Sequence, residues 1–255
     1  MGTSHKDRVI RVLLLVGIAL IGATAGQPTA LGQAVSASAS VTPTVGQIVQ
    51  RMEDRNKERS ERLRHYSSER HYHVEYHGFP GTIAASMDVE ATYDAPSSKR
   101  FRVLSQTGSG LLIDHVLKKL LKSEQEAARD QSRTALTTEN YTFGLVGSEV
   151  SDGRRFYVLQ VEPRVERKLL YLGRIWVDGN DYAVEKIEAE PAQNPSFWIR
   201  KTEIHHVYSK IGDFWLPERN RSETKVPIGG TAVLTIDYGV YRVEPSPLSN
   251  SSPAQ

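Results

Sequence analysis

The chain has 255 residues, of which 39% are hydrophobic, and it carries 32 Lys and Arg against 30 Asp and Glu. This length accommodates one large β domain or two small ones and is enough to bury a sizeable core. The absence of cysteine excludes a disulfide framework, a thiolate nucleophile, Cys-ligated zinc and a lipid-modified N-terminal cysteine. The near balance of charge creates no broad positive field and argues against a nucleic-acid partner.

The first 25 residues have the pattern of an export signal. Lys6, Arg8 and Arg11 precede a short apolar run from Val12 to Ile21, and Ala23-Thr24-Ala25 fits the small-x-small pattern of a cleavage site. The apolar run is short for a transmembrane helix, although a retained N-terminal anchor is the alternative. Removal of this segment takes away three basic residues and one acidic residue, which leaves 29 of each sign. We therefore expect an exported protein of the bacterial periplasm without a lipid anchor.

The remaining chain predicts one domain between two loose ends. Residues 26–43, rich in Ala, Ser, Thr and Gln, indicate a disordered spacer. Residues 244–255 are rich in Pro and Ser and indicate a disordered tail. The domain is expected over residues 44–243 and shows no internal repeat.

The domain is expected to open with a helix. Thr44 and Gln47 have the spacing of a capping box, and Ile48, Val49 and Met52 form a short apolar stripe. The following residues are almost all charged with mixed signs, which is typical of a solvated helix face.

Two predicted strands and a second helix follow. Residues 86–93 alternate between polar and apolar side chains, and residues 101–105 form the partner strand across a turn at 94–97. Gly108-Ser109-Gly110 then introduces a helix over 111–129 with Leu and Val on one side. The glycines would give this helix some freedom to move as a lid.

The C-terminal half predicts an antiparallel ladder, with strand signals resuming at Tyr141. Residues 169–177 and 207–210 lead into turns at 178–180 and 211–213, and residues 232–240 alternate cleanly. Asp-Gly and Gly-Asp in the two turns are expected to supply the positive φ angles of tight hairpins. The chain is therefore mainly β (α+β). A sheet of nine to eleven strands should curl, with the two helices over its concave face.

The buried faces of the adjoining strands and of the second helix predict one apolar cavity. Its expected lining residues are Met87, Val89, Phe101, Val103, Leu112, Val116 and Leu120. An apolar ligand needs buried area more than specific polar contacts.

The histidines of residues 71–77 raise the possibility of a metal site. His71, His73, Glu75 and His77 share one face of the predicted strand, which suits zinc. The competing interpretation is that Tyr72, Val74 and Tyr76 face the core and the histidines face water. We favour the second and expect exposed histidines without tightly bound metal.

Other chemical signals are weak, and the sequence predicts neither an enzyme nor a cofactor. No nucleophile elbow, phosphate-binding loop or His-Glu-x-x-His motif is present. His205 and His206 should point to opposite faces, and His115 should lie on the polar side of its helix. The larger aromatic side chains are expected to pack in the core or on the sheet, namely Trp176, Trp198, Phe214 and Trp215.

Two motifs and the order of elements carry a family resemblance. Gly173-Arg174-Ile175-Trp176-Val177-Asp178, Lys210-Ile211-Gly212-Asp213-Phe214-Trp215-Leu216-Pro217 and a final strand ending near Tyr241 resemble the superfamily of periplasmic outer-membrane lipoprotein carriers, the LolA/LolB group, over residues 44–243. The resemblance implies an incomplete β-barrel covered by lid helices, with a cavity that accepts lipoprotein or lipid acyl chains. It also implies an inner-membrane transporter and an outer-membrane acceptor as partners. Arg100 and Arg102 are the candidates for the family's lid-locking arginine.

Three hypotheses about function follow from the sequence. The first is a periplasmic carrier that moves lipoprotein or lipid towards the outer membrane. The second is a lipid-sensing or envelope-stress signalling module on the same fold, since a fold does not determine function. The third, the least favoured, is a metal-dependent enzyme that uses His71, His73 and His77.

Overall fold

The computed structural model describes residues 42–79, 81–129, 131–165, 169–193, 201–226 and 230–245. The predicted export signal, most of the predicted spacer, the tail beyond residue 245 and Trp198 lie outside these residues. Among the described residues, no helix has both the length and the apolar character needed to cross a membrane.

The first helix, α2 (Val45–Arg62), begins as its sequence predicts. The Thr44 side chain accepts a hydrogen bond from the Gln47 amide, and the Gln47 side chain accepts one from the Thr44 amide. This capping box satisfies amides that the first turn of a helix leaves unpaired. Ile48, Val49 and Met52 are buried, so the short apolar stripe attaches the helix to the sheet.

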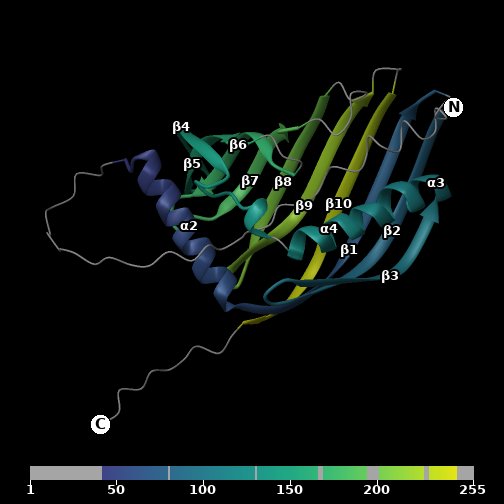
Figure 1. Ribbon diagram of the computed structural model, residues 1–255, viewed down its shortest axis with the longest axis horizontal. Coiled ribbons are helices and arrows are strands. Elements are labelled where there is room, and N and C mark those ends of the chain that lie inside the picture. Colours follow the sequence, from purple (N-terminus) through teal and green to yellow (C-terminus); the bar gives the residue numbers. More distant parts are fainter. Residues whose placement is uncertain are drawn as a thin grey trace, which may run out of the picture.

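The described strands form one antiparallel sheet with the order β3-β2-β1-β10-β9-β8-β7-β6-β5-β4 (Figure 1). The strands are β1 Leu63–Gly78, β2 Gly81–Asp94, β3 Ser98–Gly108, β4 Tyr141–Ser151, β5 Arg154–Pro163, β6 Tyr171–Asp178, β7 Val184–Pro191, β8 Lys201–Ile211, β9 Phe214–Val226 and β10 Gly230–Pro245. The last strand pairs with the first along most of its length. β3 and β4 stay at the two edges, so the sheet does not close into a barrel.

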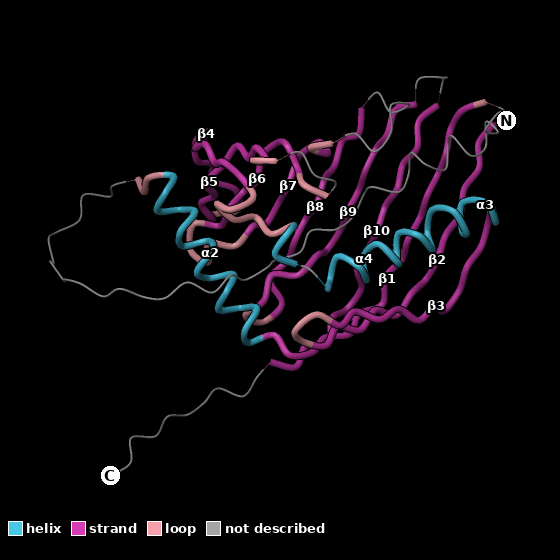
Figure 2. The backbone as a smooth tube through the Cα atoms, viewed as in Figure 1, coloured by secondary structure: helices cyan, strands magenta, loops and turns pink. Residues whose placement is uncertain are grey.

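A helical segment connects the two edge strands. It comprises α3 (Gly110–Leu112), a π-helical turn η1 (Ile113–Leu117) and α4 (Lys118–Arg129), followed by a short 3-10 turn η2 (Gln131–Arg133). Because β3 and β4 lie at opposite edges, the connection runs over one face of the sheet. Figure 2 shows α4 and α2 in front of different strands on this face. The predicted architecture, one antiparallel sheet with helices covering one face, is confirmed.

Each helix has its own core. The α3–η1–α4 segment packs on β1, β2 and β10 through side chains that include Leu112, Val116 and Leu120. Helix α2 packs on strands β4 to β9 through Ile48, Val49 and Met52. The core has two parts because the two helices cover different strands. In both parts, every second residue of each strand faces the helix. The two cores leave room between the helices.

The two predicted hairpin turns differ from each other. Gly212 has a φ of 60°, as the sequence predicts. The expectation of a positive φ at Gly179 was wrong, because the Asp178 carboxylate accepts hydrogen bonds from the amides of Asn180 and Asp181, and Tyr182 takes the positive φ of 51° instead. The last strand extends to Pro245, two residues beyond the expected domain end.

The start of the α3–η1–α4 segment requires a glycine. Gly108 has a φ of 92°, and a Cβ at this position would collide with the backbone of Ala84 and Ala85. Side chains other than hydrogen are strained in this conformation. The predicted Gly108-Ser109-Gly110 junction is therefore the point where the chain leaves β3 for the helix.

Candidate functional site

A cavity of about 100 Å³ lies between the C-terminal half of α2, the end of α4 and the helix-covered face of the sheet. A water molecule needs only about 10–15 Å³ of such volume, so the cavity accommodates several heavy atoms. Its apolar and aromatic side is formed by Leu63, Tyr66, Tyr93, Tyr208, Phe214, Trp215, Leu216 and Pro217. Its polar side is formed by Arg59, Ser60, Arg70, Lys99, Glu124, Gln131, Asn220 and Tyr238.

The aromatic side is held rigidly by ring contacts between neighbouring strands. Tyr66 of β1 stacks on Tyr93 of β2 with ring centroids 5.2 Å apart. Tyr66 also meets the edge of Tyr241 of β10 at 5.6 Å. These rings pack in one cluster with Phe214 and Leu216. Stacked and edge-to-face rings restrict each other's rotation, so this side presents a fixed apolar surface to the cavity.

The polar side contains a buried ion cluster that joins the sheet to α4. Arg70 Nη1 donates to Glu124 Oε2 at 3.0 Å, and Lys99 Nζ donates to the same oxygen at 2.7 Å. The Tyr72 hydroxyl donates to Glu124 Oε1 at 3.1 Å. The side chains of Arg70 and Glu124 are each 1% exposed and that of Lys99 is 10% exposed. Two cations therefore face one carboxylate in a buried place.

The electrostatics of this cluster keep Glu124 and Arg70 charged and Tyr72 neutral. Burial alone would raise the pKa of Glu124, but Lys99 and Arg70 hold that pKa below its usual value. Burial opposes the charge of Arg70, yet Tyr72 and Glu124 place its pKa well above the usual value. The pKa of Tyr72 is raised well above its usual value by burial and by Glu124. The site thus contains a carboxylate, two cations and a neutral phenol.

The side-chain amide of Asn220, which also lines the cavity, lacks one of its hydrogen bonds. The Asn220 side chain donates from Nδ2 to the Tyr238 hydroxyl at 2.8 Å. The guanidinium carbon of Arg70 lies 4.7 Å from the centre of the Tyr238 ring. Asn220 is 3% exposed, and its Oδ1 has no hydrogen-bond partner. A buried acceptor without a partner costs free energy, so this atom is available to a ligand donor.

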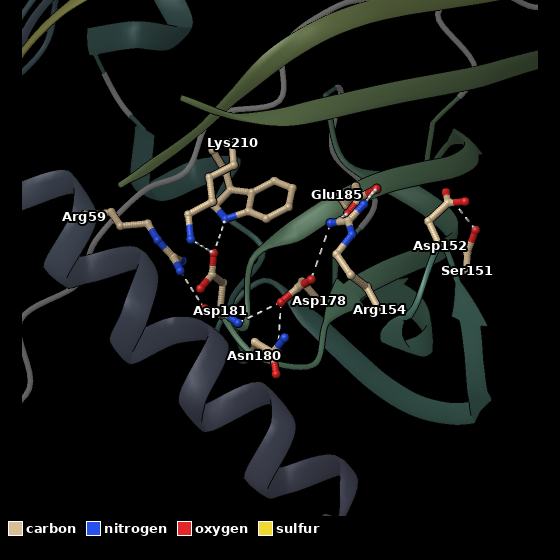
Figure 3. Close-up of polar contacts among 10 residues, drawn as sticks. Arg59, Ser151, Asp152, Arg154, Asp178, Asn180, Asp181, Glu185 and Lys210 are labelled. Carbon is tan, nitrogen blue, oxygen red and sulfur yellow. Dashed lines mark hydrogen bonds and ion pairs between the residues drawn. The ribbon is translucent and has the colours of Figure 1, made fainter. Parts of the chain in front are cut away.

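The α2 side of the cavity is anchored by the turn between β6 and β7 (Figure 3). Arg59 donates to the Asp181 carbonyl oxygen, and Lys210 Nζ lies 2.6 Å from the Asp181 carboxylate. The indole Nε1 of Trp215 donates to the same carboxylate at 3.0 Å. Behind the turn, Arg154 lies 3.5 Å from Asp178. These contacts position Arg59 and Trp215, which both line the cavity.

The predicted cavity residues largely come together, although not around this cavity. Met87, Val89, Leu112, Val116 and Leu120 are buried in one cluster, and Phe101 packs against it. Val103 differs, because it is 42% exposed on the edge strand β3 and lies outside the cluster. None of the seven lines the cavity. In this structure Leu112, Val116 and Leu120 of the helical segment cover the apolar surface of Met87 and Val89.

The two candidates for a lid-locking arginine form ion pairs with residues of the sheet. Arg100 pairs with Asp94, and Arg102 pairs with Glu90. Both arginine side chains are more than two thirds exposed, and their partners belong to the sheet. The arginine that contacts α4 is Arg70. Its signal in the sequence was a charged residue in register with Tyr72, Val74 and Tyr76 on the inward face of the first strand.

The histidine strand has the predicted orientation. Tyr72 and Val74 are fully buried and Tyr76 is 4% exposed, while the side chains of His71, His73 and His77 are 36–52% exposed. Their ring nitrogens contact Asp88, Ser86, Thr82 and Glu75. Within the described residues, no group of three or more His, Asp or Glu has the arrangement to hold a metal ion. Absence of tight metal binding stays a prediction.

The remaining aromatic and histidine predictions are partly confirmed. His206 is fully buried while His205 is not, as adjacent strand residues require, and His115 is exposed. Trp176 packs with Phe156 and Val158 in a small separate cluster. Phe214 and Trp215 are buried, but they also line the cavity, a role that the sequence analysis did not assign.

No protein-family model matches the chain, and no curated protein matches it. Among solved structures, it is similar to a DUF1329 family protein from Desulfovibrio piger, with 13% identity, a TM-score of 0.42 and coverage of 80% of this chain and 94% of that one. A putative outer membrane lipoprotein-sorting protein domain from Vibrio parahaemolyticus has 13% identity, a TM-score of 0.39 and coverage of 78% and 91%. A LolA superfamily protein from Nitrosomonas europaea has 16% identity, a TM-score of 0.34 and coverage of 81% and 96%.

One of these structures is named for outer membrane lipoprotein sorting, and another is named for the LolA superfamily. Similarity at this level does not by itself define a function for this chain. The function has to be argued from the cavity, the two cores and the ion cluster.

Proposed function

We propose that this protein is a non-enzymatic periplasmic carrier that binds the acyl chains of a lipid or lipoprotein between its helices and its sheet. The observation that supports this proposal most is the cavity between α2 and α4, which has a rigid aromatic side. Beside this cavity, the α3–η1–α4 segment covers a large apolar surface of the sheet. Acyl chains gain about 0.8 kcal/mol per buried CH₂ group. Such a ligand needs dry apolar area, which the two cores supply.

The cavity alone holds only part of an acyl chain, so the carrier has to open. The α3–η1–α4 segment presents Leu112, Val116 and Leu120 to the sheet. An acyl chain that enters between this helix face and the sheet would keep both apolar surfaces out of water. The predicted site residues are therefore core in the closed protein and become lining when α4 moves away. Gly108 and Gly110 stand at the junction where that movement starts.

The ion cluster would keep the empty carrier closed. Glu124 is the only described residue of α4 that reaches Arg70 and Lys99 of the sheet. Burial of these groups is favourable only while all three stay together. A ligand that enters beside them can loosen the contact by offering its own polar group to the same donors.

A carrier, unlike a sensor, has to transfer its ligand to an acceptor. An inner-membrane transporter would load the protein and an outer-membrane acceptor would unload it. The test of this step is transfer of a fluorescent lipid between donor and acceptor vesicles. We expect transfer to accelerate with protein concentration. Tight binding without accelerated transfer would instead support a lipid-sensing module.

Binding itself can be tested with a matched pair of helix variants. The protein is purified from the periplasm, its lipids are extracted and identified by mass spectrometry, and binding of a fluorescent fatty acid is titrated. We expect Val116→Asp, on the buried side of the helix, to abolish binding while circular dichroism retains the strand signal. His115→Asp, on the exposed side, should bind as the unmodified protein does. Absence of lipid and of fatty-acid binding in the unmodified protein would contradict the proposal.

A further inference from the structure

The polar side of the cavity carries more positive than negative charge. Arg70 and Lys99 share one oxygen of Glu124, and among the residues that the structure describes this carboxylate is the only acidic side chain on the cavity. Arg59 adds a third cation to the lining, although Asp181 lies beside it. In a buried place, charges are screened less than at the surface. The lining therefore favours a ligand that brings one negative charge.

We propose that the ligand is an amphiphile with an anionic head, a carboxylate or a phosphate, that Lys99 and Arg70 bind this head, and that the adjoining apolar surface receives the chain. This inference rests on the proposed function and specifies its ligand class. A neutral or cationic head would leave the surplus charge uncompensated.

The donors and the acceptor of the cavity fit such a head group. Lys99 is the more accessible of the two cations, with a side chain 10% exposed against 1% for Arg70. Its ammonium has three donors, of which one is directed at Glu124. The unpartnered Asn220 Oδ1 accepts from a hydroxyl of the head or of a bridging water. Charge-assisted hydrogen bonds of this kind are about twice as strong as neutral ones.

Apolar surface lies on both sides of the proposed head site along β1. Leu63, Tyr66 and Phe214 stand on the lining with Arg70 and Lys99. A head at Lys99 therefore has an apolar surface directly beside it. Tyr72 and Val74 lie on the other side of Arg70 along β1 and pack with Leu112 and Val116, so the rest of the chain extends under α4 when that helix moves away.

The experiment compares four ligands that share a twelve-carbon chain and differ only in the head. Laurate and dodecyl phosphate are the two anionic arms, dodecanol is neutral and dodecyltrimethylammonium is cationic. Each displaces a fluorescent fatty acid from the full-length purified protein, below its micelle concentration and at about pH 8. We expect the anionic ligands to bind about ten-fold or more tightly than dodecanol, and the cation to bind weakest. The two anionic arms show whether a carboxylate or a phosphate is preferred.

A charge variant locates the effect. Lys99→Gln removes one of the two cations beside Glu124 and should weaken laurate binding about ten-fold more than it changes dodecanol binding. Lys122→Gln is the matched control, because the Lys122 side chain on α4 is 76% exposed and outside the cavity. It should leave both ligands unchanged.

The outcomes separate the two proposals. Equal affinity for laurate and dodecanol, or equal weakening of both by Lys99→Gln, would overturn the anionic-head inference and leave acyl-chain binding intact. An unchanged laurate affinity in Lys99→Gln would also overturn it. If none of the four ligands binds, the carrier proposal itself fails. A preference for anionic heads that Lys99→Gln alone removes supports the inference.

Discussion

Acidification should destabilise this protein through a single buried histidine. His206 of β8 is fully buried, and neither ring nitrogen has a hydrogen-bond partner. Its nearest ring neighbour is Tyr171, with centroids 5.6 Å apart in an edge contact. Burial, with a smaller contribution from His205, lowers the pKa of His206 to about 3 from 6.5. The folded protein therefore keeps this ring neutral over a range where the unfolded chain protonates it.

The sign and size of the effect follow from that difference in pKa. A histidine with a depressed folded pKa stabilises the fold above its unfolded pKa, and the stabilisation is lost as pH falls from about 6.5 towards about 3. Between about pH 8 and about pH 5, the free energy of unfolding should fall by about 2 kcal/mol from this group alone. The loss is a sizeable part of the stability of a domain.

The assay is urea unfolding at the two pH values for the unmodified protein and for His206→Asn, which cannot titrate. The unmodified protein should lose about 2 kcal/mol more than the variant between about pH 8 and about pH 5. His205→Asn, on the opposite face of the strand, should lose as much as the unmodified protein. Equal pH dependence in His206→Asn and the unmodified protein would show that His206 is not held neutral by burial.

Two further predictions concern the ion cluster and the histidine strand. Glu124→Gln leaves Arg70 and Lys99 without their buried carboxylate and should reduce the free energy of unfolding by about 3–5 kcal/mol. Glu126→Gln, on the exposed side of α4, should change it by less than about 0.5 kcal/mol in the same urea titration. Zinc titration by calorimetry should detect no sub-micromolar site, which corresponds to about −8 kcal/mol. A site of that affinity, lost when His71, His73 and His77 are all replaced by Ala, would favour a metal-dependent role instead.

The sheet was predictable because its signal is local. Alternation in 86–93 and 232–240 defines which side chains face the helices, except at Val240, which is 85% exposed beside a register shift between β10 and β1, and the turn residues define where strands end. The pairing of the last strand with the first was not predictable in this way, since it joins residues far apart in the chain. That pairing places β10 between β1 and β9 and so determines which residues surround the cavity.

The cavity was missed because the apolar pattern marks buried surface and not empty space. Met87 and Val89 satisfy the pattern and are buried, but Leu120 and the rest of the helix fill the space over them. The better signal was a charge where the pattern calls for an apolar residue. Glu124 follows Leu117, Leu120 and Leu121 on the buried side of the helix. Side chains of this kind are buried only with partners, and the partner here lies on a different element.

Val103 shows that apolar alternation does not predict burial on the edge strand of a sheet. It pairs with Val89 and shares its side of the sheet, yet it is 42% exposed. An edge strand has a neighbour on one side only, and Val103 lies outside the apolar cluster under the helix. The alternation gave the correct side of the sheet for Val103 but not its burial.

The central claim, that an acyl chain binds between α4 and the sheet, is tested most directly by photo-crosslinking. A fatty acid with a diazirine on its chain is bound, irradiated and located by peptide mass spectrometry, with excess unlabelled fatty acid as competitor. We predict competable labels on the buried face of residues 112–121 and on the strands beneath it, β1, β2 and β10. Labels confined to exposed surface, or labels that the competitor does not reduce, would contradict the account.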